Sequence, residues 1–280
     1  MEQKDLKEYF SQLEIKMKNT DWEKLRKDHY EEELQNINNF SYWYPKIKNC
    51  GIKMVNALII QIPYEEWKAF QEAEEDKNAE IRCIEYLKYV LNMNKVKRGM
   101  YNIKNGTFSN KFDASTCNVS LEEIPQSFIK IQNASWFFDT GGTTELIIRD
   151  YIPINFNEEL TIYNGLPLRP EFRIFVDFNE NKVLYSVNYW DFDYCYPHLY
   201  NANDKLVFEY MRDTLNAEYE TKKDYVKALA NKLIIYNNNQ ENKLTGQWSV
   251  DFMLFENEYY LIDMAVAQQS AYWNVNNIDK

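Results

Sequence analysis

The chain has 280 residues, of which 45% are hydrophobic and 27% charged, so it is long enough for a large core and for two domains. Its formal net charge of −11 argues against sequence-independent binding to nucleic acid or to anionic membranes, which needs clustered Lys and Arg. The four cysteines lack CxxC spacing and only two histidines occur, so neither a zinc site nor a disulfide framework is expected.

Neither a targeting signal nor a membrane-spanning segment is expected from the sequence. The first residues, MEQKDLKEYF, do not resemble a signal peptide, and the longest apolar run, around Val55–Ile62, is too short to span a membrane. We therefore expect a cytoplasmic protein with no nucleic acid or membrane partner.

Apolar residues at helical spacing predict helices over much of the first hundred residues. These helices are expected at Leu6–Met17, Trp22–Leu34, Tyr64–Ala73 and Ala79–Leu91. A short strand is expected at Leu58–Pro63. The aromatic segment FSYWYPK, at Phe40–Lys46, is not expected to form a regular helix because Pro45 lacks a backbone N–H.

A polar loop between two lysines is the first stretch that suggests chemistry. Tyr101–Lys104 is typical of a strand end, Asn105–Asn110 of a flexible loop, and Lys111 follows directly. Two ammonium groups and several backbone N–H groups around such a loop can surround phosphates. The GxxxxGK[ST] spacing of a Walker A motif is absent, and a plain hairpin turn with two solvated lysines remains the alternative.

A strongly apolar strand is predicted at Thr144–Ile154, where Pro153 interrupts it. Arg149 and Asp150 are its charged residues, and they indicate either a functional site or simply the end of the strand. Before it, Ser120–Glu123 fits a capping box and predicts the start of a short helix.

The segment RPEFRIFVDF, at Arg169–Phe178, predicts a strand with Glu171 and Arg173 on one face. Arg173 could hold a phosphate through two hydrogen bonds or pair with a carboxylate. The elements expected after it are a strand at Lys182–Asp191, helices at Lys205–Leu215 and Lys222–Ile235, and a polar loop at Tyr236–Lys243.

The last predicted element is a hairpin, Gly246–Ala265, with its turn at Glu256–Glu258. A three-residue turn would place Asp251 directly opposite Asp263. Like charges at opposite positions destabilise a sheet, so the pair needs a proton, a basic partner or a cation. Magnesium suits two oxygen ligands on a rigid hairpin, whereas solvated aspartates on a surface hairpin are the alternative.

Taken together, these stretches resemble the ATP-grasp superfamily and, within it, the cell division cycle protein 123 family. The resemblance runs from Phe40 to Ala265 and rests on five elements in order: the WYP residues 43–45, the loop 104–111, the strand 146–152, the EFR residues 171–173 and the hairpin with two aspartates. It implies an α+β ATP-grasp fold, in which two lobes clasp ATP, with a helical N-terminal extension. Residues 1–95 are expected to form the N-terminal region and residues 96–280 the core, with the lobes meeting near 145–152.

The resemblance also implies a site for ATP and magnesium. The residues implied in phosphate or nucleotide binding are Lys104, Lys111, Arg149, Asp150, Tyr151, Ile152, Glu171 and Arg173, of which Lys104 and Arg173 would also be catalytic. Asp251 and Asp263 match the metal ligands. The family's last strand usually reads Asp-x-Asn, but Ala265 stands here in place of the asparagine, so either the metal site is weak or Gln268 or Gln269 supplies the amide.

Two functions follow from this resemblance. Most ATP-grasp proteins are ligases that phosphorylate a carboxylate and pass the acyl phosphate to a nucleophile, which requires phosphate positioning and charge neutralisation. The alternative is an ATP-binding assembly chaperone whose partner is the gamma subunit of translation initiation factor two. A third possibility is an ATP-grasp fold that binds no nucleotide.

Overall fold

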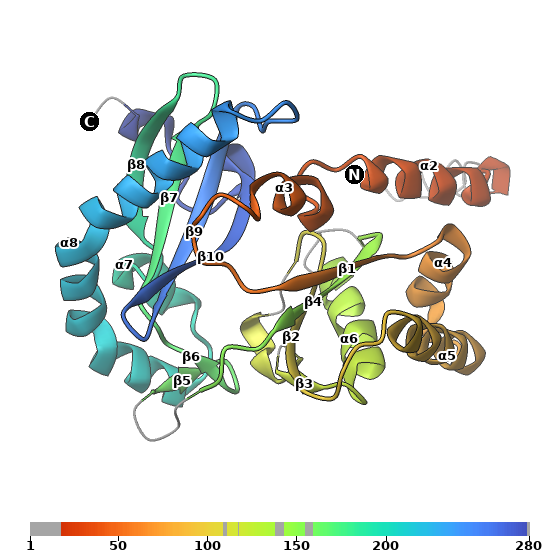
Figure 1. Cartoon of the computed structure of the whole chain (residues 1–280). Coiled ribbons are helices and arrows are strands. Elements are labelled where there is room, and N and C mark those ends of the chain that lie inside the picture. The colour runs from red at the N-terminus through yellow and green to blue at the C-terminus, as the bar shows by residue number, and fades with distance from the viewer. Residues whose placement is uncertain (1–17, 109–110, 117, 138–142, 155–158, 279–280) are drawn as a thin grey trace, which may run out of the picture.

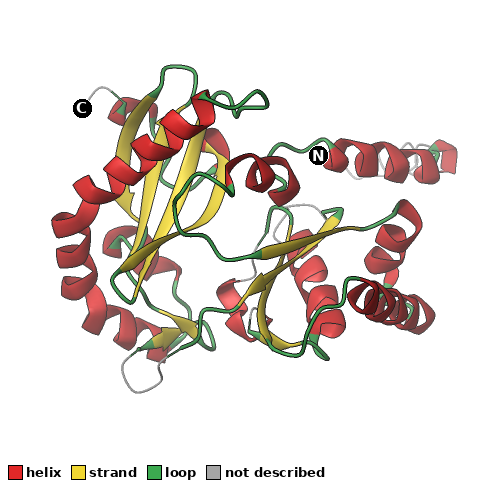
Figure 2. Ribbon diagram, viewed as in Figure 1, coloured by secondary structure: helices red, strands yellow, loops and turns green. Residues whose placement is uncertain are grey.

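The computed structural model describes residues 18–108, 111–116, 118–137, 143–154 and 159–278. The helix expected at Leu6–Met17 lies outside these residues. The described chain forms two α+β lobes that lie side by side, each built on a four-stranded sheet (Figures 1 and 2). Among the described helices, none has an apolar stretch long enough to cross a membrane.

The first lobe has a sheet in the order β1-β4-β2-β3, in which all neighbours are antiparallel. Its strands are β1 (Ala57–Gln61), β2 (Met100–Asn105), β3 (Val119–Ser120) and β4 (Glu145–Asp150). Its helices are α4 (Tyr64–Glu72), α5 (Lys77–Met93) and α6 (Ile124–Phe137). Leu146 and Ile148 join the core under these helices, whereas Ile147 joins the core of the second lobe. The middle of β4 is therefore buried on both faces, which explains the three consecutive apolar residues 146–148.

The N-terminal region is shared between the lobes. Strand β1 pairs with β4, and α4 and α5 pack in the same core as α6, so the boundary expected at residue 95 falls inside the first lobe. Helix α2 (Trp22–Leu34) lies beside α4 of the first lobe (Figure 1), where Tyr30 donates to the carbonyl of Ile62 at 2.9 Å and packs against Trp67. Helix α3 (Phe40–Ile47) packs in the second core.

Helix α3 contradicts the expectation for the aromatic segment, because it continues through Pro45. Proline removes one backbone hydrogen bond from the helix. Burial of Phe40, Trp43 and Ile47, each at most 1% exposed, offsets that loss.

The second lobe has an antiparallel sheet in the order β10-β9-β7-β8. Its strands are β7 (Glu171–Asp177), β8 (Lys182–Asn188), β9 (Gln247–Phe255) and β10 (Glu258–Val266). Phe172 and Ile174 point into the core beneath helix α8 (Ala202–Asn238), which crosses the sheet along its whole length in Figure 1. The two helices expected at Lys205–Leu215 and Lys222–Ile235 are thus one helix, because the polar residues between them include neither glycine nor proline.

Smaller elements complete the second lobe and its junction with the first. They are η1 (Lys111–Thr116), β5 (Thr161–Ile162), β6 (Leu166–Pro167), α7 (Phe192–Cys195), η2 (Tyr196–His198), η3 (Ala267–Gln269) and η4 (Val275–Asn277). Ala114 N donates to the carbonyl of Tyr163 at 2.8 Å, which ties η1 to the β5–β6 hairpin.

The β9–β10 hairpin has a two-residue turn rather than the expected three. Glu256 and Asn257 both have positive φ, at 49° and 61°, as tight hairpin turns require. Phe255 therefore pairs with Glu258. A β-bulge between Leu261 and Asp263 adds one residue and restores the expected pairing of Asp263 with Asp251.

Candidate functional site

A cleft of about 980 Å³, measured out to open solvent, lies between the two sheets. One wall comes from the end of β4 and the residues after it, and the other from β7, β9 and β10. The polar residues that line it are Asn102, Asn118, Arg149, Asp150, Arg169, Glu171, Asp251 and Asp263.

An ion pair between Arg173 and Asp251 forms the floor of the cleft on the second sheet. The two residues pair across β7 and β9. Arg173 Nε and Nη2 donate to Asp251 Oδ1 and Oδ2 at 2.8 and 2.7 Å. Both side chains are about nine-tenths buried, and the neighbouring carboxylate raises the pKa of Arg173 although burial opposes its charge. Arg173 thus lies on the expected face, opposite Phe172 and Ile174, but behind Asp251 rather than on the cleft surface.

A second ion pair, between Lys104 and Asp263, joins the two lobes. Lys104 Nζ donates to Asp263 Oδ1 and Oδ2 at 3.0 and 2.8 Å. Lys104 is 1% exposed and Asp263 32% exposed. Burial opposes ionisation of Asp263, but the charges of Lys104 and Arg149 hold its pKa below the usual value. Each of the two aspartates therefore has its own basic partner, which offsets the repulsion expected between them.

Arg149 makes a further link between the lobes. Its Nε and Nη2 donate to Asn102 Oδ1 at 3.2 and 2.6 Å, and its Nη1 donates to the carbonyl of Ile262 on β10 at 2.8 Å. The guanidinium therefore lies in the cleft beside Asp263, where its positive charge is close to both walls.

Apolar side chains also line the cleft, several of them near the point where the chain crosses between the lobes. They are Val55, Ile152, Leu166, Pro167, Met253 and Ile262. Arg169 lies among the lining residues, where it binds Glu159 and donates to the carbonyl of Pro153 at 2.7 Å. The lining thus combines apolar and charged side chains, a composition that suits a ligand with an aromatic base and an anionic group.

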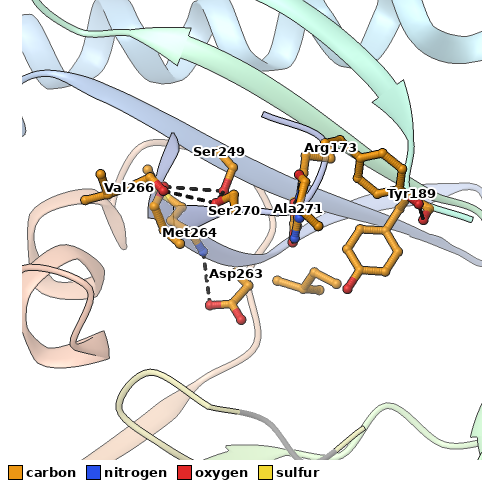
Figure 3. A network of polar contacts seen from close by, with 12 residues as sticks. Arg173, Tyr189, Ser249, Asp263, Met264, Val266, Ser270 and Ala271 are labelled. Carbon is orange, nitrogen blue, oxygen red and sulfur yellow. Dashed lines mark hydrogen bonds and ion pairs between the residues drawn. The ribbon is translucent and has the colours of Figure 1, made fainter. Parts of the chain in front are cut away.

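The segment after β10 packs onto the same face of the second sheet, next to the Arg173–Asp251 pair. Ser249, two residues from Asp251 on the same face of β9, forms a hydrogen bond of 2.7 Å with Ser270, and Arg173 Nη1 donates to the carbonyl of Ala271 at 3.1 Å (Figure 3). Trp273 lies against Phe175, with ring centroids 5.3 Å apart. Residues 270–273 therefore cover the sheet immediately beyond the Arg173–Asp251 pair.

Tyr272 holds that segment in place at a conformational cost. Its φ of 68° is unusual for a bulky residue. Its hydroxyl donates to the carbonyl of Tyr189 at 2.8 Å, and its own carbonyl accepts a bond from Tyr185 at 3.1 Å. Nothing in the polar sequence after Ala265 indicated this return of the chain onto the sheet, and it is the largest feature of the site that the sequence did not predict.

Most of the residues predicted for the site gather around the cleft. Arg149, Asp150, Tyr151, Ile152, Glu171, Asp251 and Asp263 line it, and Lys104 and Arg173 lie directly behind the two aspartates. The side chain of Lys111 is outside the described structure. Gln268 Nε2 donates to Gln247, and Gln269 accepts a bond from Asn38, so both glutamines are bound away from Asp263. Arg169 and Asn102 were not predicted.

The two lobes and the cleft between them define an α+β fold with N-terminal helices, and this fold is similar to that of a solved structure of Cdc123. Among solved structures, the chain is similar to C-terminally truncated Cdc123 from Schizosaccharomyces pombe, with 14% identity and a TM-score of 0.53 over 85% of this chain and 88% of that one. Cdc123 from the same organism has 14% identity and a TM-score of 0.49, over 83% of this chain and 85% of that one. The RimK domain ATP-grasp protein from Sphaerobacter thermophilus DSM 20745 has 10% identity and a TM-score of 0.40, over 86% of this chain and 63% of that one.

At this level of identity, the similarity to solved structures establishes the fold alone. No family model matches the sequence, and the comparison with curated proteins gives no match. The function must therefore be argued from the cleft itself.

Proposed function

We propose that the protein binds ATP together with magnesium in the cleft between its lobes. The observation that carries this proposal is the composition of the cleft, whose lining combines apolar residues with Arg149, Asp251 and Asp263 and has Lys104 and Arg173 directly behind the two aspartates. In this proposal an adenine ring packs against apolar lining residues such as Ile152 and Met253. The triphosphate then extends toward the two aspartates.

The donor set fits one magnesium ion. Asp251 and Asp263 pair on adjacent strands, and magnesium is commonly held by one or two carboxylates together with phosphate oxygens. In the described part of the chain, no three His, Cys, Asp or Glu side chains come together as a metal-binding group. Ala265 offers only a methyl group, so these residues supply no full shell for a second ion. When bound, the metal would neutralise phosphate charge.

Two functions remain for such a site, a ligase that acts through an acyl phosphate and an assembly chaperone. Residues 270–273 favour a binding protein, because they cover the sheet face beyond Asp251, where an acceptor for the proposed phosphates would otherwise have room. The chaperone proposal carries with it the partner expected from the sequence, the gamma subunit of translation initiation factor two. A ligase needs this segment to move.

Calorimetric titration with a non-hydrolysable ATP analogue and magnesium tests nucleotide binding. Arg149→Gln should weaken affinity by about 10- to 100-fold, because it removes a charged donor from the cleft. Arg82→Gln is the matched control, since Arg82 lies in an exposed ion pair with Glu66 on the first lobe. Equal affinities for wild type and Arg149→Gln would remove Arg149 from the site.

ADP formation separates the ligase from the chaperone. Wild type and a chain ending at Gln269 are incubated with magnesium-ATP and the low-molecular-weight fraction of a cell extract. A ligase produces ADP only with that fraction, and more rapidly when residues 270–280 are absent. ATP binding without ADP in either protein supports the chaperone.

A further inference from the structure

The groups that would meet metal and phosphate are already engaged with each other. Both oxygens of Asp263 accept bonds from Lys104, at 3.0 and 2.8 Å. The Lys104 side chain is 1% exposed, so water cannot take the place of the carboxylate. An incoming ion therefore meets a closed ion pair at this point rather than a single charge.

Each ion alone would break this pair at a cost. A cation bound to Asp263 would leave the buried ammonium of Lys104 without its counter-charge. A phosphate bound to Lys104 would leave the carboxylate of Asp263 next to phosphate oxygens of the same charge. When both ions arrive, each member of the pair gains a new partner, and no buried charge is left alone.

We infer that the Lys104–Asp263 pair is exchanged on ligand binding, so that a nucleoside polyphosphate and a divalent cation bind together and neither binds well alone. This inference rests on the proposed function and adds a role for one residue: Asp263 holds Lys104 and thereby keeps metal-free nucleotide out. Because Lys104 is on β2 and Asp263 on β10, the exchange also replaces a direct bridge between the lobes by one through the ligand.

The Arg173–Asp251 pair is less able to exchange its partners for ligand ions. All three nitrogens of the Arg173 guanidinium donate hydrogen bonds, two of them to Asp251 and the third to the carbonyl of Ala271. The coupling between metal and nucleotide is therefore assigned to Asp263 and Lys104, and the test is made on that pair.

Wild-type protein gives the first test, by calorimetry with the ATP analogue in magnesium, with the analogue in EDTA, and with magnesium alone. Magnesium should tighten analogue binding by at least about tenfold, because the exchange releases Lys104 to make a charged hydrogen bond to phosphate. By linkage, the analogue must tighten magnesium binding by the same factor.

Asp263→Asn gives the second test. It frees Lys104, so the affinity for the metal-free analogue should rise by about tenfold or more, and the effect of magnesium should shrink. Asp224→Asn is the matched control, since Asp224 lies on helix α8 outside the cleft lining and its ion-pair partner is Lys227, in an exposed pair. It removes the same single charge and should keep the magnesium dependence.

The outcomes separate the exchange from the proposed function. Binding of the magnesium complex, with weak binding of each component and metal-free binding rescued only in Asp263→Asn, supports the exchange. Equal wild-type affinities with and without magnesium would overturn the exchange but leave nucleotide binding in place, and this comparison decides even if Asp263→Asn does not fold. No binding of the analogue under any condition would overturn both.

Discussion

Replacing Asp263 by Asn should destabilise the ligand-free protein, although it removes one of two carboxylates that lie opposite each other. The reason is Lys104, whose side chain is 1% exposed and whose partner is Asp263. Breaking a buried ion pair from one side costs about 3–5 kcal/mol, and an exposed pair contributes about 0–1 kcal/mol. Because Asp263 itself is 32% exposed, we expect the free energy of unfolding to fall by about 2–3 kcal/mol.

Urea unfolding measures this loss as a lower midpoint with an unchanged slope. Glu66→Gln is the control, because Arg82 binds Glu66 through two nitrogens at 3.0 and 2.9 Å but the pair is exposed, so its loss should cost less than about 1 kcal/mol. If Asp263→Asn is as stable as wild type, Lys104 does not depend on this carboxylate, and the assigned ion pair is wrong.

Three further outcomes can be checked by the same unfolding experiments. The difference between wild type and Asp263→Asn should be full at neutral pH and vanish as pH falls below the aspartate value of 3.8, because the folded-state pKa of Asp263 is lowered and its contribution is lost only on protonation. Gly106→Ala should cost about 1–3 kcal/mol, since its Cβ would lie 2.4 Å from Glu145 Oε1 and 2.5 Å from Asn39 Oδ1, whereas Gly99→Ala, with nothing closer than 3.5 Å, should be near neutral. Glu145→Gln should stabilise the protein by about 1 kcal/mol, because burial raises the pKa of Glu145 and the amide can donate where Glu145 and Asn39 both carry unpartnered oxygens. That gain should grow as pH rises above 4.5, where an ionised Glu145 disfavours the folded state, and a gain that shrinks with rising pH would contradict this assignment.

The periodicity of apolar residues predicted the elements that pack by one face. Helix α2 has the expected bounds, Trp22–Leu34, and strand β7 places Phe172 and Ile174 inward as alternation requires. Errors came where tertiary packing outweighs local preference. Pro45 is tolerated inside α3 because its neighbours are buried. The polar middle of α8 stays helical because both halves of the helix pack, the first in a cluster around Trp190 and the second against the sheet.

The pairing of Asp251 with Asp263 was predicted from a wrong turn length, because a β-bulge compensated for the missing residue. Strand alternation gives the face on which a charged side chain lies, but it cannot give the partner, which comes from another strand or another lobe. Lys104 and Asp263 are 159 residues apart, and only the folded structure brings them together. The return of residues 270–273 over the sheet likewise depends on contacts between distant segments.

A crystal structure of the protein with magnesium and the non-hydrolysable ATP analogue tests the central claim most directly. The base should pack against Ile152 and Met253, and the phosphates should lie next to Asp251 and Asp263. Lys104 Nζ should contact a phosphate oxygen, and Asp263 should contact the metal instead of Lys104. A nucleotide bound outside the cleft, or a nucleotide within it beside an intact Lys104–Asp263 pair, would contradict the account.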